Sequence, residues 1–266
     1  MPTLITLNAP DRRIEFLMQL DPDVPTESAI LWHYYRGVVP EPEVVHLMMR
    51  VLRPGDCAID GGANIGFFTL LMAKLVGDSG HVIAVEPDTD NFVALERNLA
   101  LNFCKADCRR AALWDYSLLP FFHAREDAGT GSMWAESGPY VCLPNMGAVY
   151  LDEVGGERLR LIKFDIEGAE YRALKGGPKL LREAAVPFVI CEMNAKALEV
   201  AKTSPAAIRE LMHDYGYDMF LLWNDGALPS LIPPGSAFRP SRPNTNVLFS
   251  TLEHVSKVWP EVSDGA

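Results

Sequence analysis

A glycine-rich segment follows a short apolar run and leads into a stretch with helical spacing. Its sequence is Asp60-Gly61-Gly62-Ala63-Asn64-Ile65-Gly66. Glycines allow a tight turn and a close approach of the backbone to a ligand, and free N–H groups at a helix start hold a carboxylate or a phosphate. Because nucleotide-like ligands bind at the carboxyl ends of strands in an open α/β sheet, the segment predicts such a site.

Glu86 ends the next predicted strand, twenty residues after Gly66 and directly before Pro87. An acid at this position accepts hydrogen bonds from both hydroxyls of a ribose. A glycine turn alone is often only a tight connection, and a lone acid is often a solvated loop residue. Since each feature stands at the end of its own strand, the pair favours an adenosine ligand.

The details of the glycine segment bear on which adenosine ligand it binds. A dinucleotide fingerprint requires G-x-G-x-x-G, but Ala63 occupies the second glycine position. Asp60 would also repel a diphosphate, whereas it would attract the ammonium and sulfonium groups of S-adenosylmethionine. We therefore predict S-adenosylmethionine as the cofactor. The alternatives are a dinucleotide-dependent oxidoreductase and a non-catalytic subunit that binds S-adenosylmethionine without turning it over.

Further acids follow the next two predicted strands. Asp165 follows the apolar run 159–164, and Glu167 and Glu170 stand near a helix start, where the dipole favours acids. The following strand leads into Glu192 and Asn194. An acid at the ligand-facing edge can take a proton from a reacting group, so we predict Asp165 as the general base and Glu192 as the second choice.

Metal binding is an alternative that the sequence does not favour. Asp165, Glu192 and Asn194 offer oxygen ligands of the kind that Mg²⁺ and Ca²⁺ accept. Cys104 and Cys108 lack a second ligand pair nearby, so zinc is a weak candidate. The five cysteines fit reduced structural thiols. We predict no metal ligands.

The positions of these residues depend on an alternation of short apolar runs with helical stretches. Predicted strands cover residues 57–60, 81–85, 159–164, 187–191, 217–223 and 246–250, with a further strand before residue 114; predicted helices cover 65–76, 89–102, 169–175, 178–184 and 204–215. This pattern predicts a doubly wound α/β fold whose seven-stranded sheet is mostly parallel, with helices on both faces.

Other segments flank this pattern. Residues 1–40 are expected to form an N-terminal extension with a hairpin (3–7 and 12–18) and a helix capped by Thr26 or Ser28, and residues 41–266 the main domain, opened by a helix at 40–52. Residues 114–157 form an insertion rich in turn signals, which we interpret as a lid. Its aromatic residues are expected to anchor the lid or stack on a sugar: Phe121, Phe122, Trp134 and Tyr140.

The composition limits the partners. The 266 residues include 24 Lys and Arg against 35 Asp and Glu, which gives a formal charge of −11. This sign disfavours nucleic acid as a partner. The start has no signal-peptide pattern, and no run of about 18 apolar residues occurs, so we expect a cytoplasmic protein with no membrane partner. The composition does not predict the oligomeric state.

The motifs resemble those of the FkbM family of S-adenosylmethionine-dependent methyltransferases. The resemblance runs from about residue 41 to 250 and rests on 51–69, on Glu86-Pro87-Asp88 with Asn98, and on 162–170. It implies a Rossmann-like class I methyltransferase fold with an antiparallel last strand, and O-methylation of a small-molecule hydroxyl on a sugar, glycoside, polyketide or other secondary metabolite. The residues assigned to the cofactor are Asp60, Gly61, Gly62, Ala63, Asn64, Gly66, Thr69, Glu86, Pro87 and Asp165.

Overall fold

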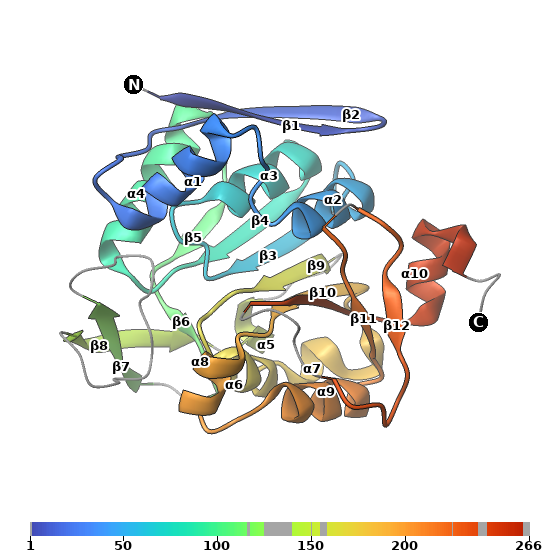
Figure 1. Cartoon of the computed structure of the whole chain (residues 1–266). Helices are drawn as coiled ribbons and strands as arrows, with labels where there is room; N and C mark the ends of the chain where they lie inside the picture. Colours follow the sequence, from blue (N-terminus) through green and yellow to red (C-terminus); the bar gives the residue numbers. More distant parts are fainter. Residues whose placement is uncertain are drawn as a thin grey trace.

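The computed structural model describes residues 2–115, 118–124, 140–149, 151–154, 159–224, 226–238 and 244–262. Its centre is an eight-stranded sheet with the order β12-β11-β13-β10-β9-β3-β4-β5 (Figure 1). The strands are β3 Cys57–Gly61, β4 His81–Val85, β5 Asp107–Arg109, β9 Leu159–Phe164, β10 Phe188–Glu192, β11 Asp218–Leu221, β12 Ser230–Ile232 and β13 Asn246–Ser250. All seven predicted strands are present, and β12 is an additional edge strand.

The strands from β5 to β10 run parallel, and β13 pairs antiparallel with both β10 and β11. The expected mostly parallel sheet with an antiparallel last strand is therefore confirmed. β3 lies between β4 and β9, with Gly61 opposite Phe164. Because these strands point the same way, their carboxyl ends place the glycine segment, Glu86 and Asp165 at one edge.

Helices cover both faces of the sheet (Figure 1). Neighbouring residues of a strand alternate between the two faces: Leu161 packs into one hydrophobic cluster and Ile162 into the other. The helices are α1 Pro25–Tyr35, α2 Pro42–Val51, α3 Phe67–Val76, α4 Thr89–Leu101, α5 Leu151–Val154, α6 Glu170–Lys175, α7 Pro178–Leu181, α8 Ala195–Val200, α9 Pro205–Asp214 and α10 Leu252–Val258, with 3-10 turns at Arg182–Ala184 and Pro260–Val262.

The N-terminal hairpin consists of β1 Thr3–Ala9 and β2 Arg12–Met18 and packs on α3 and α4. The ring centroids of Phe16 and Phe67 lie 5.6 Å apart, and the Leu17 N–H donates to Asn102 Oδ1 at 2.7 Å. The hairpin thus shares the core of the main sheet. The separation of residues 1–40 from the domain at 41–266 stays a prediction.

Helix capping agrees with the sequence at α9 and differs at α1. Ser204 Oγ accepts from the Ala207 N–H at 3.1 Å, as a cap should. The expected cap of α1 was wrong: Val24 holds the N-cap position without a side-chain hydrogen bond, and Pro25 begins the helix. Proline supplies the helical φ and needs no N–H partner there, so no hydroxyl cap is required.

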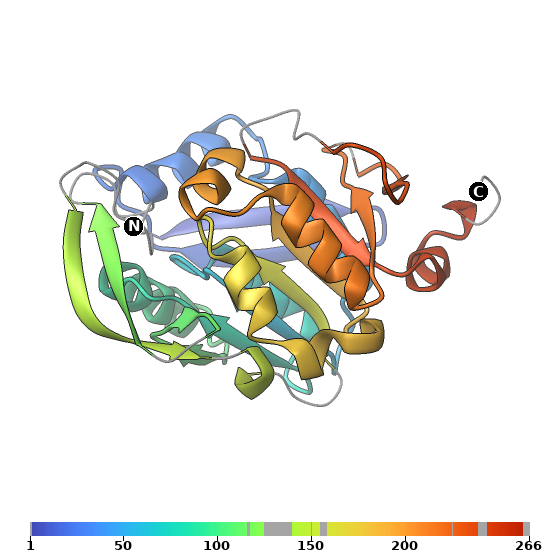
Figure 2. The ribbon, with the colours of Figure 1, turned by 90° about the horizontal axis from the view of Figure 1, so that it is seen from below.

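The insertion contains strands. β7 Leu118–Ala124 pairs antiparallel with β8 Tyr140–Val149, and β6 Ala112–Leu113 pairs parallel with β8. Figure 2 shows this pair at the end of the molecule opposite α10. The side chains of Phe121, Phe122, Trp134 and Tyr140 lie outside the described residues. The lid function stays a prediction.

Candidate active site

Two cavities meet at the carboxyl edge of the sheet. The first, of about 100 Å³, is lined by residues that include Gly62, Asn64, Glu86, Asp165 and Glu167, and we call it the strand-end cavity. The second, of about 190 Å³, extends beneath α1, and we call it the α1 cavity. Gly62, Asn64 and Asp165 line both. The edge therefore offers two adjoining spaces that share one carboxylate.

Gly62 holds the tightest point of the glycine segment. Its φ is +79°, and a Cβ built there would lie 1.9 Å from the carbonyl oxygen of Asp165. Only glycine avoids this clash. Asn64 also takes a positive φ, of 48°, a conformation that asparagine tolerates better than most residues. The segment thus packs directly against the backbone that carries the second acidic motif.

The N–H groups of the segment are engaged more fully than the sequence suggested. Those of Gly62 and Ala63 donate to the Val85 carbonyl at 2.9 and 3.1 Å. The Asn64 N–H donates to Glu86 Oε2 at 2.8 Å. Within the described residues, these three groups therefore hold the segment against β4. The anion site expected at the N–H groups of the helix start, which lies at Phe67, stays a prediction.

Glu86 lies in the wall of the strand-end cavity and is 5% exposed. Its other oxygen, Oε1, accepts from the Asp88 N–H at 2.9 Å. Burial raises the pKa of Glu86 to about 7 although these N–H bonds oppose the shift. Each carboxylate oxygen has a further lone pair, so the side chain can fix the loop and still accept from a ribose.

Four of the predicted cofactor residues line neither cavity: Asp60, Gly61, Gly66 and Thr69. Asp60 is 1% exposed and accepts from Thr69 Oγ1 at 2.6 Å, so these two side chains lie behind the glycine segment. Asp60 Oδ1 is buried with no partner among the described residues. The other six line at least one cavity, namely Gly62, Ala63, Asn64, Glu86, Pro87 and Asp165.

Lys163 is a site residue that the sequence reasoning missed. It is 1% exposed, and its Nζ lies 3.0 Å from Asp165 Oδ2. Burial alone would lower the pKa of Lys163, but Asp165, Glu41 and Asp60 more than offset this and raise it. The lysine therefore stays charged and holds Asp165 at the junction of the two cavities.

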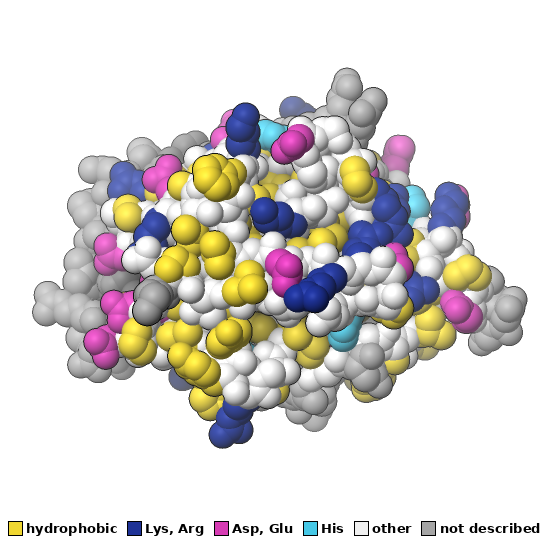
Figure 3. Space-filling model, turned by 90° about the horizontal axis from the view of Figure 1, so that it is seen from above, with side chains coloured by type: hydrophobic (Ala, Val, Ile, Leu, Met, Phe, Trp, Pro, Cys, Tyr) yellow, Lys and Arg dark blue, Asp and Glu magenta, His cyan; other side chains and the backbone are white. Residues whose placement is uncertain are grey.

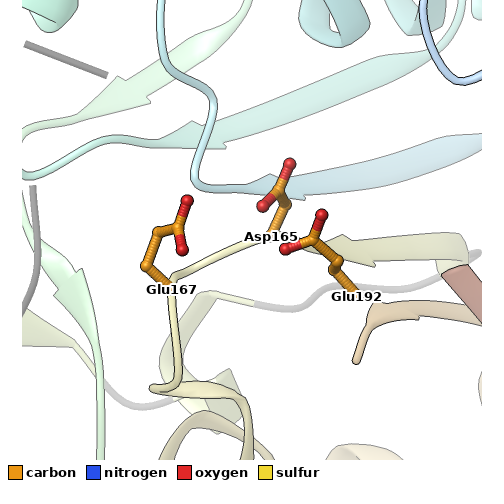
Figure 4. A group of neighbouring side chains, drawn as sticks. All are labelled: Asp165, Glu167 and Glu192. Atoms are coloured by element: carbon orange, nitrogen blue, oxygen red, sulfur yellow. The ribbon is translucent and has the colours of Figure 1, made fainter. Parts of the chain in front are cut away.

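Three carboxylates converge at this edge of the sheet, as Figure 4 shows, and Lys163 pairs with one of them. Oxygens of Asp165, Glu167 and Glu192 lie within 4.8 Å of one another. Glu192 is 5% exposed, and its Oε2 has no partner among the described residues. Burial and the neighbouring acids raise the pKa of Glu192 to about 10, so it carries a proton at neutral pH. This group has ligand types and spacing that suit a hard cation.

Near this group, the structure changes the predicted role of Asn194 and supports that of Glu170. Asn194 Oδ1 accepts from the Ala197 N–H at 3.1 Å as the cap of α8, while Nδ2 lies 3.4 Å from Glu167 Oε2. Asn194 thus orients Glu167, which replaces it in the oxygen cluster. Glu170 begins α6 and accepts from the Ile166 N–H at 3.0 Å, which supports its interpretation as a helix-start acid.

Glu41 is the second missed residue. It precedes α2 with φ +40°, lines the α1 cavity and accepts from Asn246 Nδ2 at 2.9 Å. The same amide lies 3.0 Å from Glu43 Oε1. Burial raises the pKa of Glu41 to about 7, although Lys163 opposes the shift. The sequence offers no pattern for this position beyond prolines on either side.

Residues 60–219 match the family model described as the methyltransferase FkbM domain. The chain belongs to the FkbM methyltransferase family. The cofactor of this FkbM methyltransferase is S-adenosylmethionine, and its sheet has the expected class I fold. Family membership removes the alternative of a dinucleotide-dependent oxidoreductase.

Several solved structures resemble this FkbM methyltransferase. The methyltransferase FkbM from Methylobacillus flagellatus KT is 18% identical, with a TM-score of 0.45, and the match covers 87% of this chain and 56% of that one. An rRNA methylase from Streptococcus thermophilus is 11% identical (TM-score 0.47, 81% and 98% covered). Aeropyrum pernix fibrillarin, with natively bound S-adenosyl-L-methionine, is 12% identical, with a TM-score of 0.45, and the match covers 79% of this chain and 76% of that one.

The present chain thus spans little more than half of the M. flagellatus protein. None of the curated proteins matches it.

Two remaining observations concern cysteines and membranes. Cys104, Cys108 and Cys191 are free thiols, in line with the expected reduced state; Cys142 has no described side chain. Among the described residues, no helix has the length and apolar character needed to span a membrane.

Proposed function

We propose that this FkbM methyltransferase transfers the methyl group of S-adenosylmethionine to a hydroxyl of a small molecule, of the sugar or secondary-metabolite kind. The observation that carries the proposal is the position of Asp165, which lines both the strand-end cavity and the α1 cavity. A donor in the first cavity and an acceptor in the second would meet at this carboxylate. Such an arrangement supplies the proximity that methyl transfer mainly requires.

The adenosine fits the strand-end cavity best, with Glu86 accepting from the ribose hydroxyls and Pro87 beside the base. Gly62, Ala63 and Asn64 would line the methionine end, because they also face the α1 cavity. Asp60 lies behind this segment and lines neither cavity, so its charge would act on the ammonium group from behind the glycine segment. Of the ten predicted cofactor residues, these assignments keep six beside the cavities: Gly62, Ala63, Asn64, Glu86, Pro87 and Asp165.

The reaction breaks the bond between sulfur and the methyl carbon and forms a bond from the acceptor oxygen to that carbon. The hydroxyl proton passes to a carboxylate, and Asp165 remains our first choice because it borders both cavities. Glu192 fits the role of second base poorly, since a carboxyl with a pKa of about 10 is already protonated. Glu41, whose pKa of about 7 matches neutral conditions, takes its place as the alternative base.

Methyl transfer from labelled S-adenosylmethionine to a panel of sugar nucleotides, glycosides and polyketides tests the proposal. We expect at least one hydroxyl compound to become labelled. If the protein binds S-adenosylmethionine but labels none of them, then the alternative of a non-catalytic cofactor-binding subunit gains support. Labelling of RNA instead would contradict the proposed acceptor class.

A further inference from the structure

A larger cavity lies beside the start of β9 and extends along α2 to the loop that follows β11. Its volume is about 650 Å³, and we call it the amino-edge groove. The groove is bordered by the β1–β2 turn, α2, the start of β9, the loop at 222–229 and the end of α10. In Figure 1 these elements lie on the side of α2 and α10, away from β7 and β8. The groove is therefore separate from the methyl-transfer site.

Basic side chains line this groove. They are Arg50, Arg53, Arg160 and Lys257. Figure 3 shows Lys and Arg side chains gathered on this side of the molecule. Lys257 is paired with Glu253 at 2.6 Å, but no described carboxylate lies within ion-pair distance of the three arginines. In a chain of formal charge −11, three arginines without acidic partners around one cavity favour an anionic occupant.

The arginine contacts leave donors available. Arg50 Nη2 donates to the Val258 carbonyl at 3.3 Å, Arg53 Nη1 to that of Leu52 at 2.9 Å, and Arg160 Nε to that of Val51 at 3.4 Å. A guanidinium has five N–H donors, so each retains several for another ligand. Carbonyl contacts also leave the positive charges unneutralised.

Aromatic rings hold two of the arginines in place. Arg50 lies 5.3 Å from the centroid of the Trp259 ring, and Arg160 lies 4.9 Å from that of Phe188. Stacked guanidinium groups lose less conformational entropy when they bind an oxyanion. The rings therefore order the guanidinium groups of Arg50 and Arg160 before a ligand binds.

The acids that border the groove are engaged with other groups. Asp11 pairs with Arg12 at 3.4 Å, and Glu43 Oε1 lies 3.0 Å from the amide of Asn246. Trp223 also lines the groove and is 45% exposed, while its Nε1 donates to Ser230 Oγ at 3.0 Å. This bond holds an exposed indole in the wall of the cavity that the cations also line.

We propose that the amino-edge groove binds a phosphorylated small molecule whose planar part stacks on Trp223. The guanidinium groups of Arg50, Arg53 and Arg160 would hold the phosphate oxygens, because the planar fork of a guanidinium matches the spacing of two phosphate oxygens. The volume of about 650 Å³ lies within the usual range for small-molecule sites. A nucleoside diphosphate has both required parts.

Calorimetric titration with pyrophosphate and with ADP, at constant ionic strength, tests this proposal. Saturating S-adenosylhomocysteine keeps ADP out of the adenosine site. We expect both compounds to bind, ADP more tightly. Arg53→Ala should weaken both by about tenfold or more, since hydrogen bonds to charged groups have this size. Arg53 is exposed, and the described hydrogen bond of its side chain goes to the Leu52 carbonyl, while its backbone bonds with Asp56 remain in the variant, so its replacement leaves the fold intact.

Two variants separate the parts of the site. Trp223→Ala should weaken ADP by roughly tenfold and leave pyrophosphate unchanged, because stacking involves only the base. Arg182→Ala, at an exposed position outside the groove, is the matched control and should change neither affinity. Absence of binding to wild type, or equal weakening by Arg53→Ala and Arg182→Ala, would overturn the proposal.

Discussion

The ammonium of Lys163 lies 3.0 Å from Oδ2 of Asp165, and the lysine is buried while the aspartate faces both cavities. A buried cation behind a partly exposed carboxylate fixes the direction in which that carboxylate points. In the mechanism that we propose, the second oxygen of Asp165 accepts the acceptor's proton while Oδ2 stays paired with Lys163. This pair makes Asp165 the residue whose substitution is most informative.

Asp165→Asn should keep S-adenosylmethionine binding within about tenfold and reduce turnover by roughly 10² to 10⁴, because the amide retains the shape but takes no proton. Cofactor calorimetry and single-turnover rates on this variant separate the two effects. Weaker cofactor binding with normal turnover at saturation would instead assign Asp165 to the cofactor's ammonium. In that case Glu41→Gln is the next variant to measure.

Glu86→Ala should weaken S-adenosylmethionine binding by about 1.5 to 3 kcal/mol, the size of hydrogen bonds to a charged group. The variant also loses the bonds from the Asn64 and Asp88 N–H groups, so its melting temperature should fall. Glu86→Gln keeps an acceptor oxygen and should therefore retain more of the cofactor affinity and more of the melting temperature than Glu86→Ala. Unchanged cofactor affinity in Glu86→Ala would leave Glu86 with the loop-fixing role alone.

Gly62→Ala should abolish cofactor binding, because its Cβ would lie 1.9 Å from the Asp165 carbonyl oxygen and force the two loops apart. Gly77→Ala is the matched control. Gly77 also has a positive φ, of 64°, but a Cβ there would meet nothing within 4 Å. We expect the control to lose about 1 to 3 kcal/mol of stability to backbone strain and to bind normally, as measured by thermal denaturation and calorimetry. Normal binding by Gly62→Ala would place the cofactor elsewhere.

Glu170 predicts a pH dependence of stability. Burial raises its pKa in the folded protein from 4.5 to about 8. Above pH 4.5 the unfolded chain loses this proton first, so the contribution of Glu170 to the free energy of unfolding falls until about pH 8. Glu170→Gln should therefore lose less stability than wild type in urea denaturation between about pH 5 and 8. The exposed Glu199→Gln should follow wild type, and identical slopes for all three proteins would contradict the shift.

Metal removal tests the carboxylate group of Asp165, Glu167 and Glu192. We expect turnover to survive excess EDTA, because Lys163 offsets the charge of Asp165 and Glu192 is protonated at neutral pH. Both effects reduce the repulsion that a cation would otherwise relieve. A loss of activity that Mg²⁺ restores, together with a Mg²⁺-dependent rise in melting temperature, would show that the group holds a metal.

The sequence predicted those parts of the site that follow directly from strand ends. The glycine segment, Glu86 and Asp165 each succeed an apolar run, so parallel pairing alone brings them together. Lys163 belongs to the 162–170 motif but was given no role at the site, because a lysine inside an apolar run gives no sign of full burial. Its burial depends on acids from other segments.

Glu41 was missed for a related reason, since its partner Asn246 lies 205 residues away. The short elements β12, α8 and α10, of three, six and seven residues, leave too little periodicity to detect. Local sequence patterns therefore predicted the strand ends that position the site, whereas long-range contacts determine the charge states of its side chains.

The amide of Asn246, the first residue of β13, joins Glu41 and Glu43 at the opening of α2. β13 also lies between β10 and β11 in the sheet. The same segment, close to the C-terminal end of the chain, therefore completes both the sheet and the wall of the α1 cavity. During synthesis, a nascent chain exposes every strand-end acid before this segment leaves the ribosome. The protein should then become able to catalyse its reaction in one step near the end of translation. In that step residues 246–250 pair with β10 and β11, and Asn246 at the same time fixes the position of Glu41.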